Sequence, residues 1–181
     1  LPICHQLQPE ETLWYRRTFA VEGKHQDMRT LLHFGAVDWK CKVFINGEHI
    51  GEHIGGYDLF TFDITEALNK GQNTLVLAVQ DPSDSEPIQR GKQVLDPGFI
   101  WYTTVSGIWQ TVWLEFVPQT YIGLLKITPQ FDDDSVAIQV QVNPENTDLR
   151  FMAEVFNSGE RVTSADASPG KTLTLPLPDP K

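Results

Sequence analysis

The stretch DWKCKVFING, residues 38–47, decides the fold class. Within it, Cys41, Val43 and Ile45 alternate with Lys40 and Lys42, which is the two-residue period of a β-strand with one face on a core. The stretch ends in Asn-Gly, the strongest short signal for a β-hairpin turn. A half-buried strand that turns at once into its neighbour favours a β-sandwich over a parallel sheet.

The same alternation recurs along most of the chain. Its apolar positions are Leu75, Leu77 and Val79, then Val136, Ile138, Val140 and Val142, then Leu149, Phe151, Ala153 and Val155, and finally Leu173, Leu175 and Leu177. A helix is predicted only over residues 63–71, with Thr65 as its N-cap and Gly71 at its end. The sequence therefore predicts an all-β fold built from short strands.

Two units are predicted. A dense strand at residues 107–117 ends at Pro118, and the aromatic content falls after Gly123. We therefore predict one domain over residues 1–118 and a second unit over residues 119–181. An immunoglobulin-like sandwich has seven strands in about 100 residues, so the second unit is expected to be incomplete. Its open sheet edge would invite pairing with a second chain, as in a homo-oligomer.

Composition narrows the range of partners. Apolar residues make up 40% of the 181 residues, enough for a core, and 14 Lys and Arg face 24 Asp and Glu, a net charge of −10. A nucleic-acid-binding protein needs a basic face, and none is visible, so nucleic acid is not an expected partner. No apolar run approaches the roughly 18 residues of a membrane span, so no membrane is expected either. Residues 1–12 lack the pattern of a signal peptide.

No metal or cofactor is expected. Cys4 and Cys41 could pair, but Cys41 fits better as a small buried thiol, and two cysteines have no zinc spacing. His49 and His53 lie four apart in tandem copies of Glu-His-Ile-Gly, whose glycines argue against the helix that a zinc site of this spacing needs. The acidic run at residues 132–134 lacks the spacing of a calcium loop and fits a solvated turn. No phosphate loop or dinucleotide fingerprint is present.

A long, turn-rich segment from Asp81 to Gly98 leads to Trp101 and Tyr102. Long loops in compact domains are often functional, so either ring could stack on a sugar. The alternative is that both residues open the next strand and simply pack. Adjacent residues of a strand point to opposite faces, so at most one of the two rings can lie in the core.

The other tryptophans are predicted to fill the core. Trp14, Trp39, Trp109 and Trp113 are large enough to span the space between two sheets, and packing is the first explanation for them.

Four motifs occur in a fixed order. They are WYRRTF at residues 14–19, NGEHIG at 46–51, GGYDLF with FDIT at 55–65, and SGIWQTV at 106–112. In this order and at these separations they resemble glycoside hydrolase family 2, the family of β-galactosidases, β-glucuronidases and β-mannosidases. The resemblance covers residues 14–118 well and residues 119–181 more loosely.

The resemblance implies a jelly-roll, galactose-binding-like β-sandwich for residues 1–118, called the sugar-binding domain, followed by an immunoglobulin-like sandwich. In this family the two catalytic glutamates lie on a later (β/α)₈ barrel. No catalytic residue and no hydrolysis is therefore expected within the 181 residues. Some members send an acidic residue to the active site just before the SGIW strand. Here that region reads FIWYTT, residues 99–104, so Trp101 or Tyr102 is the expected substrate-binding residue.

Two functions remain open on this basis. The chain could be the N-terminal part of a family 2 glycosidase that shapes the entrance of the active site and docks the barrel. It could instead be a free-standing carbohydrate-binding module. The unfinished second unit favours the first, with a carbohydrate substrate and the barrel as partners. Bacteria that degrade polysaccharides often export such enzymes, which favours a periplasmic or secreted location.

Overall fold

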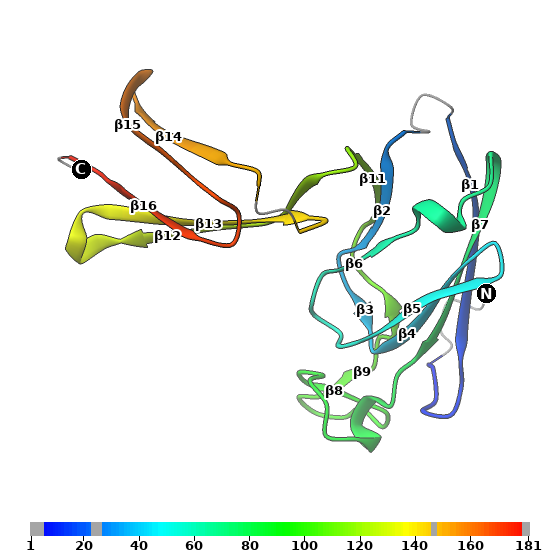
Figure 1. Ribbon diagram of the computed structural model, residues 1–181. Coiled ribbons are helices and arrows are strands. Elements are labelled where there is room, and N and C mark those ends of the chain that lie inside the picture. Colours follow the sequence, from blue (N-terminus) through cyan, green and yellow to red (C-terminus); the bar gives the residue numbers. More distant parts are fainter. Residues whose placement is uncertain (1–5, 23–26, 146–147, 179–181) are drawn as a thin grey trace. The chain divides into compact units, whose positions relative to one another are not determined.

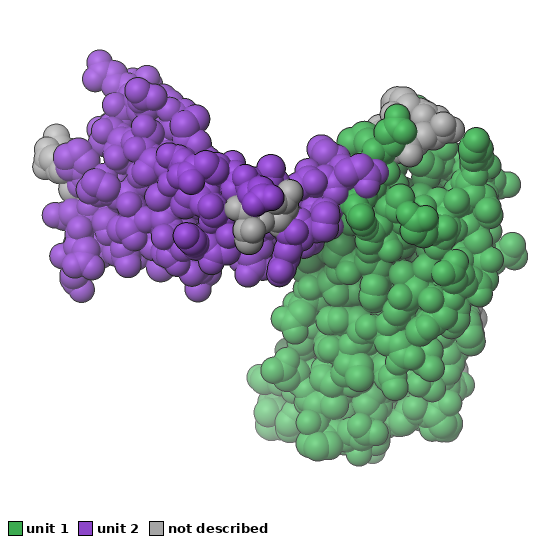
Figure 2. Space-filling model, in the orientation of Figure 1, with its two compact units in different colours: residues 1–117 green, residues 118–181 purple. Residues whose placement is uncertain are grey.

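The computed structural model describes residues 6–22, 27–145 and 148–178 of the chain. These residues form β-strands joined by loops and short 3₁₀ turns (Figure 1). The chain divides into two compact units, Leu1–Val117 and Pro118–Lys181 (Figure 2). Each unit has a hydrophobic core of its own. None of the helical turns in the described residues is long and apolar enough to span a bilayer.

Unit 1 is a sandwich of two antiparallel sheets. The larger sheet has the order β1-β7-β4-β5, formed in that order by Leu13–Val21, Gly71–Gln80, Lys40–Ile45 and Glu48–Ile54. The second sheet has the order β11-β2-β6, formed by Val112–Val117, Arg29–Phe34 and Phe60–Asp63. Two short pairs are added: β3 (Val37–Asp38) with β10 (Gly107–Ile108), and β8 (Gln93–Val94) parallel to β9 (Tyr102–Thr103).

The core of unit 1 confirms the alternation predicted for β4. Cys41, Val43 and Ile45 are fully buried, whereas Lys42 between them is exposed. Cys41 is a free thiol, and burial raises its pKa to about 11. The buried thiol is what the sequence favoured for Cys41, and Cys4, its possible partner, lies outside the described residues.

The hairpin from β4 to β5 turns at Asn46 and Gly47, which both have positive φ, as the predicted Asn-Gly turn requires. A register shift after Val43 then places a β-bulge in β5, the edge strand of the larger sheet. The unpaired residue of the bulge is Ile50, which lies between His49 and His53. His49 pairs with Phe44 on the outer face, whereas His53 pairs with Cys41 on the core face.

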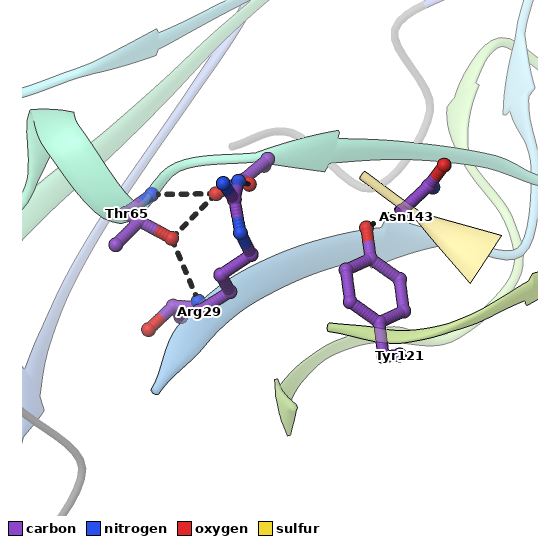
Figure 3. A network of polar contacts seen from close by, with 6 residues as sticks. Arg29, Thr65, Tyr121 and Asn143 are labelled. Atoms are coloured by element: carbon purple, nitrogen blue, oxygen red, sulfur yellow. Dashed lines mark hydrogen bonds and ion pairs between the residues drawn. The ribbon is translucent and has the colours of Figure 1, made fainter. Parts of the chain in front are cut away.

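The helix predicted over residues 63–71 is wrong. Only Thr65–Ala67 form a single 3₁₀ turn, η2, between β6 and β7. Thr65 is not an N-cap, because its hydroxyl accepts a hydrogen bond from the backbone N–H of Thr30 and donates one to Asp63 (Figure 3). Asp63 accepts the backbone N–H of Thr65 and pairs with Arg29. These bonds to β2 hold the segment as a connection, which overrides its modest helix propensity.

The prediction that the tryptophans fill the core is also wrong. Trp14, Trp109 and Trp113 are 61%, 47% and 38% exposed, and Trp39 is half-buried. Trp14 and Trp113 stand on the outer faces of β1 and β11, because their neighbours in sequence are the ones that pack inward. Aliphatic side chains and Phe34, stacked on Phe60 with ring centroids 4.8 Å apart, fill the core instead.

Unit 2 contains a sheet and a separate hairpin. The sheet has the order β12-β13-β16, formed by Tyr121–Gln130, Ser135–Asn143 and Thr172–Pro176, and the hairpin joins β14 (Phe151–Asn157) to β15 (Glu160–Ala167). A hydrogen bond from the Asn143 side chain to the Tyr121 hydroxyl links the ends of β12 and β13 (Figure 3). The buried core consists of Ile138, Val140, Val142, Leu173 and Leu175.

Asp132 and Asp133 of the acidic run lie in a 3₁₀ turn, η4 (Phe131–Asp133), and Asp134 follows it and leads into β13. All three carboxylates are exposed, which agrees with the predicted solvated turn. Within the described ranges, no group of three or more His, Cys, Asp or Glu could hold a metal ion.

Backbone amides of β12 are expected to exchange with solvent faster than those of β7. Strand β12 is a sheet edge, and its Leu125 and Ile127 remain 56% and 59% exposed although they pair with Val140 and Ile138 of the core. Strand β7 lies inside the larger sheet of unit 1. Protection factors from NMR hydrogen exchange should differ at least about tenfold, because weakly covered segments open locally. Equal protection of both strands in a dilute monomer would contradict this expectation.

Candidate functional site

The connection between β7 and β10, residues 81–106, is an ordered loop. It contains the 3₁₀ turn η3 (Ser83–Ser85) and the parallel pair β8–β9. Asp81, only 3% exposed, accepts the backbone N–H of Ser83 at 2.8 Å and the hydroxyl of Ser106 at 2.5 Å. One carboxylate therefore ties the beginning of the loop to its end. The sequence indicated the length of this loop. It indicated neither the β8–β9 pair nor the hydrogen bonds to Asp81 that join the two ends of the loop.

Trp101 and Tyr102 both lie on the surface of the loop, 45% and 66% exposed. The Tyr102 backbone N–H donates to the carbonyl of Lys92 at 2.8 Å, which continues the β8–β9 pair. Phe99 and Ile100 are exposed as well. Residues 99–102 thus form an apolar surface segment, which we call the aromatic rim. Neither predicted ring takes part in the buried core of unit 1.

A pocket of about 170 Å³ lies at the same end of unit 1. It is lined by Asp38, Tyr57, Gln93, Val105 and Trp109. The lining includes neither Trp101 nor Tyr102, but Gln93 pairs with Tyr102 in the β8–β9 register. The aromatic rim is therefore connected to the pocket through this strand pair.

Two sequence motifs meet in the pocket wall. The indole N–H of Trp109, from SGIWQTV, donates to the carbonyl of Gly56, from GGYDLF, at 2.7 Å. The Tyr57 ring meets the Trp109 ring edge-on, with centroids 5.8 Å apart. Sequence reasoning identified both motifs but interpreted one as a turn and the other as core. Their joint role could have been suspected only from the contact between them.

Gly56 allows a close approach in this wall. A Cβ at position 56 would lie 2.5 Å from Oδ1 of Asp38, so the carboxyl group packs directly on the glycine backbone. Gly55 precedes it with φ of +128°, a conformation that residues other than glycine rarely adopt. The Gly-Gly pair therefore sets the position of Asp38 at the pocket.

Asp38 places a buried carboxyl group at the pocket. The residue is 8% exposed, and its buried Oδ1 has no hydrogen-bond partner among the described residues. Burial, and then the nearby charge of Asp81, raise the pKa of Asp38 to about 6. The Nε2 atom of His53 and the Oγ1 atom of Thr104 are also buried without a partner in the described part of the chain. The sequence did not single out Asp38.

The arrangement suits part of a sugar. Aromatic rings cover the apolar C–H faces of a ligand, while a carboxyl group and an amide such as Gln93 orient its polar groups. Small-molecule pockets usually enclose about 300–1,000 Å³, so a pocket of about 170 Å³ encloses only one end of such a ligand.

Comparison with known proteins identifies the family of the domain that carries this pocket. Residues 3–118 match the family model "Glycosyl hydrolases family 2, sugar binding domain". A β-galactosidase of Thermoanaerobacter pseudethanolicus is 35% identical over 125 residues, 68% of this chain and 16% of that protein. A β-galactosidase of Priestia megaterium is 29% identical over 171 residues, 90% of this chain and 15% of that protein.

The fold recurs in solved structures. A Lactobacillus rhamnosus β-glucuronidase superposes with a TM-score of 0.73 at 25% identity, over 94% of this chain and 30% of that one. The chain thus spans about one sixth of the length of the two β-galactosidases it matches and under a third of the superposed β-glucuronidase.

Proposed function

Because the chain belongs to family 2 of the glycosyl hydrolases through that family's sugar-binding domain, we propose that its pocket end borders the active site of a glycosidase. The catalytic groups would then lie on a barrel domain outside residues 1–181. Residues 1–118 would be the sugar-binding domain, and residues 119–181 the first part of an immunoglobulin-like domain. The chain would contribute one wall of the substrate site and a docking surface for the barrel.

The observation that carries this proposal is the pocket between two family motifs. Tyr57 and Trp109 supply aromatic walls, and Asp38 supplies a buried carboxyl group with an unpartnered oxygen. A polar atom that is buried without a partner costs stability, so such an atom at a pocket favours a ligand that satisfies it. The hydroxyl groups of a carbohydrate are suitable donors.

The aromatic rim extends the proposed sugar contact beyond the pocket. Trp101 and Tyr102 stand on exposed loop surface next to Gln93, where they are free to stack on a ligand that leaves the pocket. Exposed rings in a contiguous apolar segment are typical of binding surfaces. We therefore assign substrate contact to Trp101 or Tyr102, with the pocket residues binding the end of the sugar.

Replacing Trp109 with Ala in the protein expressed from its complete reading frame is expected to lower kcat/KM at least tenfold. A tenfold loss corresponds to about 1.4 kcal/mol of transition-state stabilisation. Trp101→Ala and Tyr102→Ala, measured separately, should include one variant with a similar loss. Nitrophenyl galactoside, glucuronide and mannoside serve as substrates. Trp113→Phe is the matched control, since Trp113 is exposed on the outer face of β11.

Two results would contradict the proposal. Wild-type kinetics in all three alanine variants, with melting temperatures unchanged, would mean that the loop is only a connection. Tight binding of an oligosaccharide by the 181-residue chain alone would instead favour the carbohydrate-binding module. A single small pocket and one or two rings give little free energy against the entropy of association, so only weak sugar binding is expected of the chain by itself.

A further inference from the structure

Strand β1 (Leu13–Val21) is a long edge strand. It pairs with β7 along all nine residues without a register shift, and it forms the outer edge of the larger sheet. Its sequence has neither proline nor glycine. Proteins usually protect such an edge with a bulge, a proline or a cover, because its free N–H and C=O groups can pair with another strand. Among the described residues, β1 has β7 as its only ladder partner.

Two adjacent arginines mark the middle of this edge. Arg16 and Arg17 are exposed, and neither side chain has a hydrogen bond or ion pair among the described residues. Arg17 shares the inward side of β1 with Tyr15 and Phe19, which pack against the core. Arg16 stands on the outward side with Trp14, which is 61% exposed. Two adjacent arginines give this edge a local positive charge in a chain of net charge −10.

A cavity of about 540 Å³ adjoins β1 on the inward side. Its wall includes the aliphatic side chains of Leu75, Leu77, Ile108 and Val112, together with atoms of both Arg16 and Arg17. Tyr15 also lines it, and its hydroxyl oxygen accepts the backbone N–H of Ile108 at 3.3 Å. The cavity therefore combines an apolar floor with a guanidinium group at its margin. A ligand that carries an apolar side chain next to a carboxylate would complement both the apolar floor and the guanidinium group.

We propose that the β1 edge is a docking surface for an extended, acidic segment of a partner protein, which adds as a strand beside β1. The main chain of the segment would pair with the free edge, its carboxylates would meet Arg16 and Arg17, and an apolar side chain would enter the cavity. Strand addition of this kind takes affinity from main-chain bonds and specificity from alternate side chains.

Charge argues against a second copy of the chain as the occupant. Arg17 is the central residue of Leu13–Val21, so two β1 strands paired antiparallel over their full length would set Arg17 directly opposite Arg17. Like charges directly opposite each other in a sheet are destabilising. The same arginines that discourage self-pairing attract a segment of opposite charge.

The test uses two end-blocked heptapeptides, VTEEVTV and VTKKVTV, titrated into the 181-residue chain. In an antiparallel pairing, the two Glu of the first peptide fall opposite Arg16 and Arg17, and the flanking Val side chains face the cavity. We expect the acidic peptide to shift the NMR signals of the β1 amides, and the basic peptide to leave them unchanged. Arg16→Gln with Arg17→Gln should weaken the acidic peptide at least tenfold.

The matched control is Lys126→Gln with Lys171→Gln, which removes the same charge from exposed positions of unit 2. This variant should bind the acidic peptide as the wild type does. Equal binding of both peptides, or no binding of either, overturns the proposal. So does equally tight binding of 4-phenylbutyrate at the same amides, because the cavity would then be a small-molecule carboxylate site. Self-association through β1 would also overturn it.

Discussion

Gly107→Ala is expected to destabilise residues 1–117 by about 3 kcal/mol or more, from backbone strain and overpacking together. Gly107 has φ of +100°, and a Cβ there would lie 2.1 Å from the Tyr15 hydroxyl oxygen and 3.1 Å from Leu13. A domain of this size has a total stability of roughly 5–15 kcal/mol, so the variant would lose a large share of it. Urea denaturation followed by circular dichroism measures the change.

Two further variants isolate the cause. Gly71 also has a positive φ, +87°, but a Cβ there would meet nothing within 4 Å, so Gly71→Ala should cost only the backbone strain, about 1 kcal/mol. Tyr15→Phe removes the clashing oxygen and should recover part of the loss when combined with Gly107→Ala. Equal losses at positions 71 and 107, or no recovery in the double variant, would contradict the explanation.

The Gly107 contact also explains why two distant motifs occur together in this chain. Tyr15 belongs to WYRRTF and Gly107 to SGIWQTV, 92 positions further on. The tyrosine hydroxyl needs the space that a side chain at position 107 would fill, and it receives the backbone N–H of Ile108. The two motifs are therefore in direct contact at Tyr15 and Gly107.

Asp38→Asn is expected to stabilise unit 1 at pH 7 by about 3 kcal/mol and to have little effect at pH 3.5. The pKa of Asp38 is raised from 3.8 to about 6, chiefly by burial and then by the charge of Asp81. The folded state consequently binds the proton more tightly than the unfolded state. Stability should therefore fall as the pH rises from about 4 to about 6. The neutral amide of Asn removes this loss.

Asp63→Asn is the matched comparison, with the opposite sign. Partial burial would raise the pKa of Asp63, but hydrogen bonds from Thr65 and the ion pair with Arg29 outweigh it and lower the pKa. This carboxylate contributes stability above its unfolded pKa of about 3.8, and the contribution is lost as the pH falls. The variant should thus be destabilised at pH 7. Urea titrations of both variants from pH 3 to 8 would contradict the assignment if the two changes had the same sign.

The sequence predicts those parts of the fold that depend on local pattern. In β4 successive side chains point to opposite faces of the sheet. The alternation of Cys41, Val43 and Ile45 is therefore sufficient to predict which residues are buried. The segment after Asp63 is different, because its conformation depends on hydrogen bonds to Thr30 and Arg29 of β2, far away in sequence. The large apolar side chain of Trp14 led to the wrong prediction that it fills the core, whereas it lies on an outer face of the sandwich.

The site was predictable only in part for the same reason. Two family motifs meet in the pocket wall, because Gly56 and Trp109 belong to them, but sequence alone assigned one the role of a turn and the other the role of core packing. Asp38 gave no signal of its own, since its burial arises from Gly56 and its raised pKa partly from Asp81. Whether Trp101 and Tyr102 touch a substrate stays a prediction that kinetics can test.

The bulge in β5 makes the tandem tetrapeptides a controlled comparison within one molecule. His49 and His53 have identical neighbours in sequence, yet His49 is exposed against Phe44, and His53 stacks on Phe60 with centroids 4.0 Å apart. A method that judges a substitution by the two residues on either side must score the two positions alike, because both histidines lie in Gly-Glu-His-Ile-Gly. The fold does not, since a polar replacement at His49 meets water, whereas one at His53 meets the core. Tolerance to mutation at the two histidines therefore depends on strand register. The one extra residue of the bulge places His49 on the outer face and His53 on the core face.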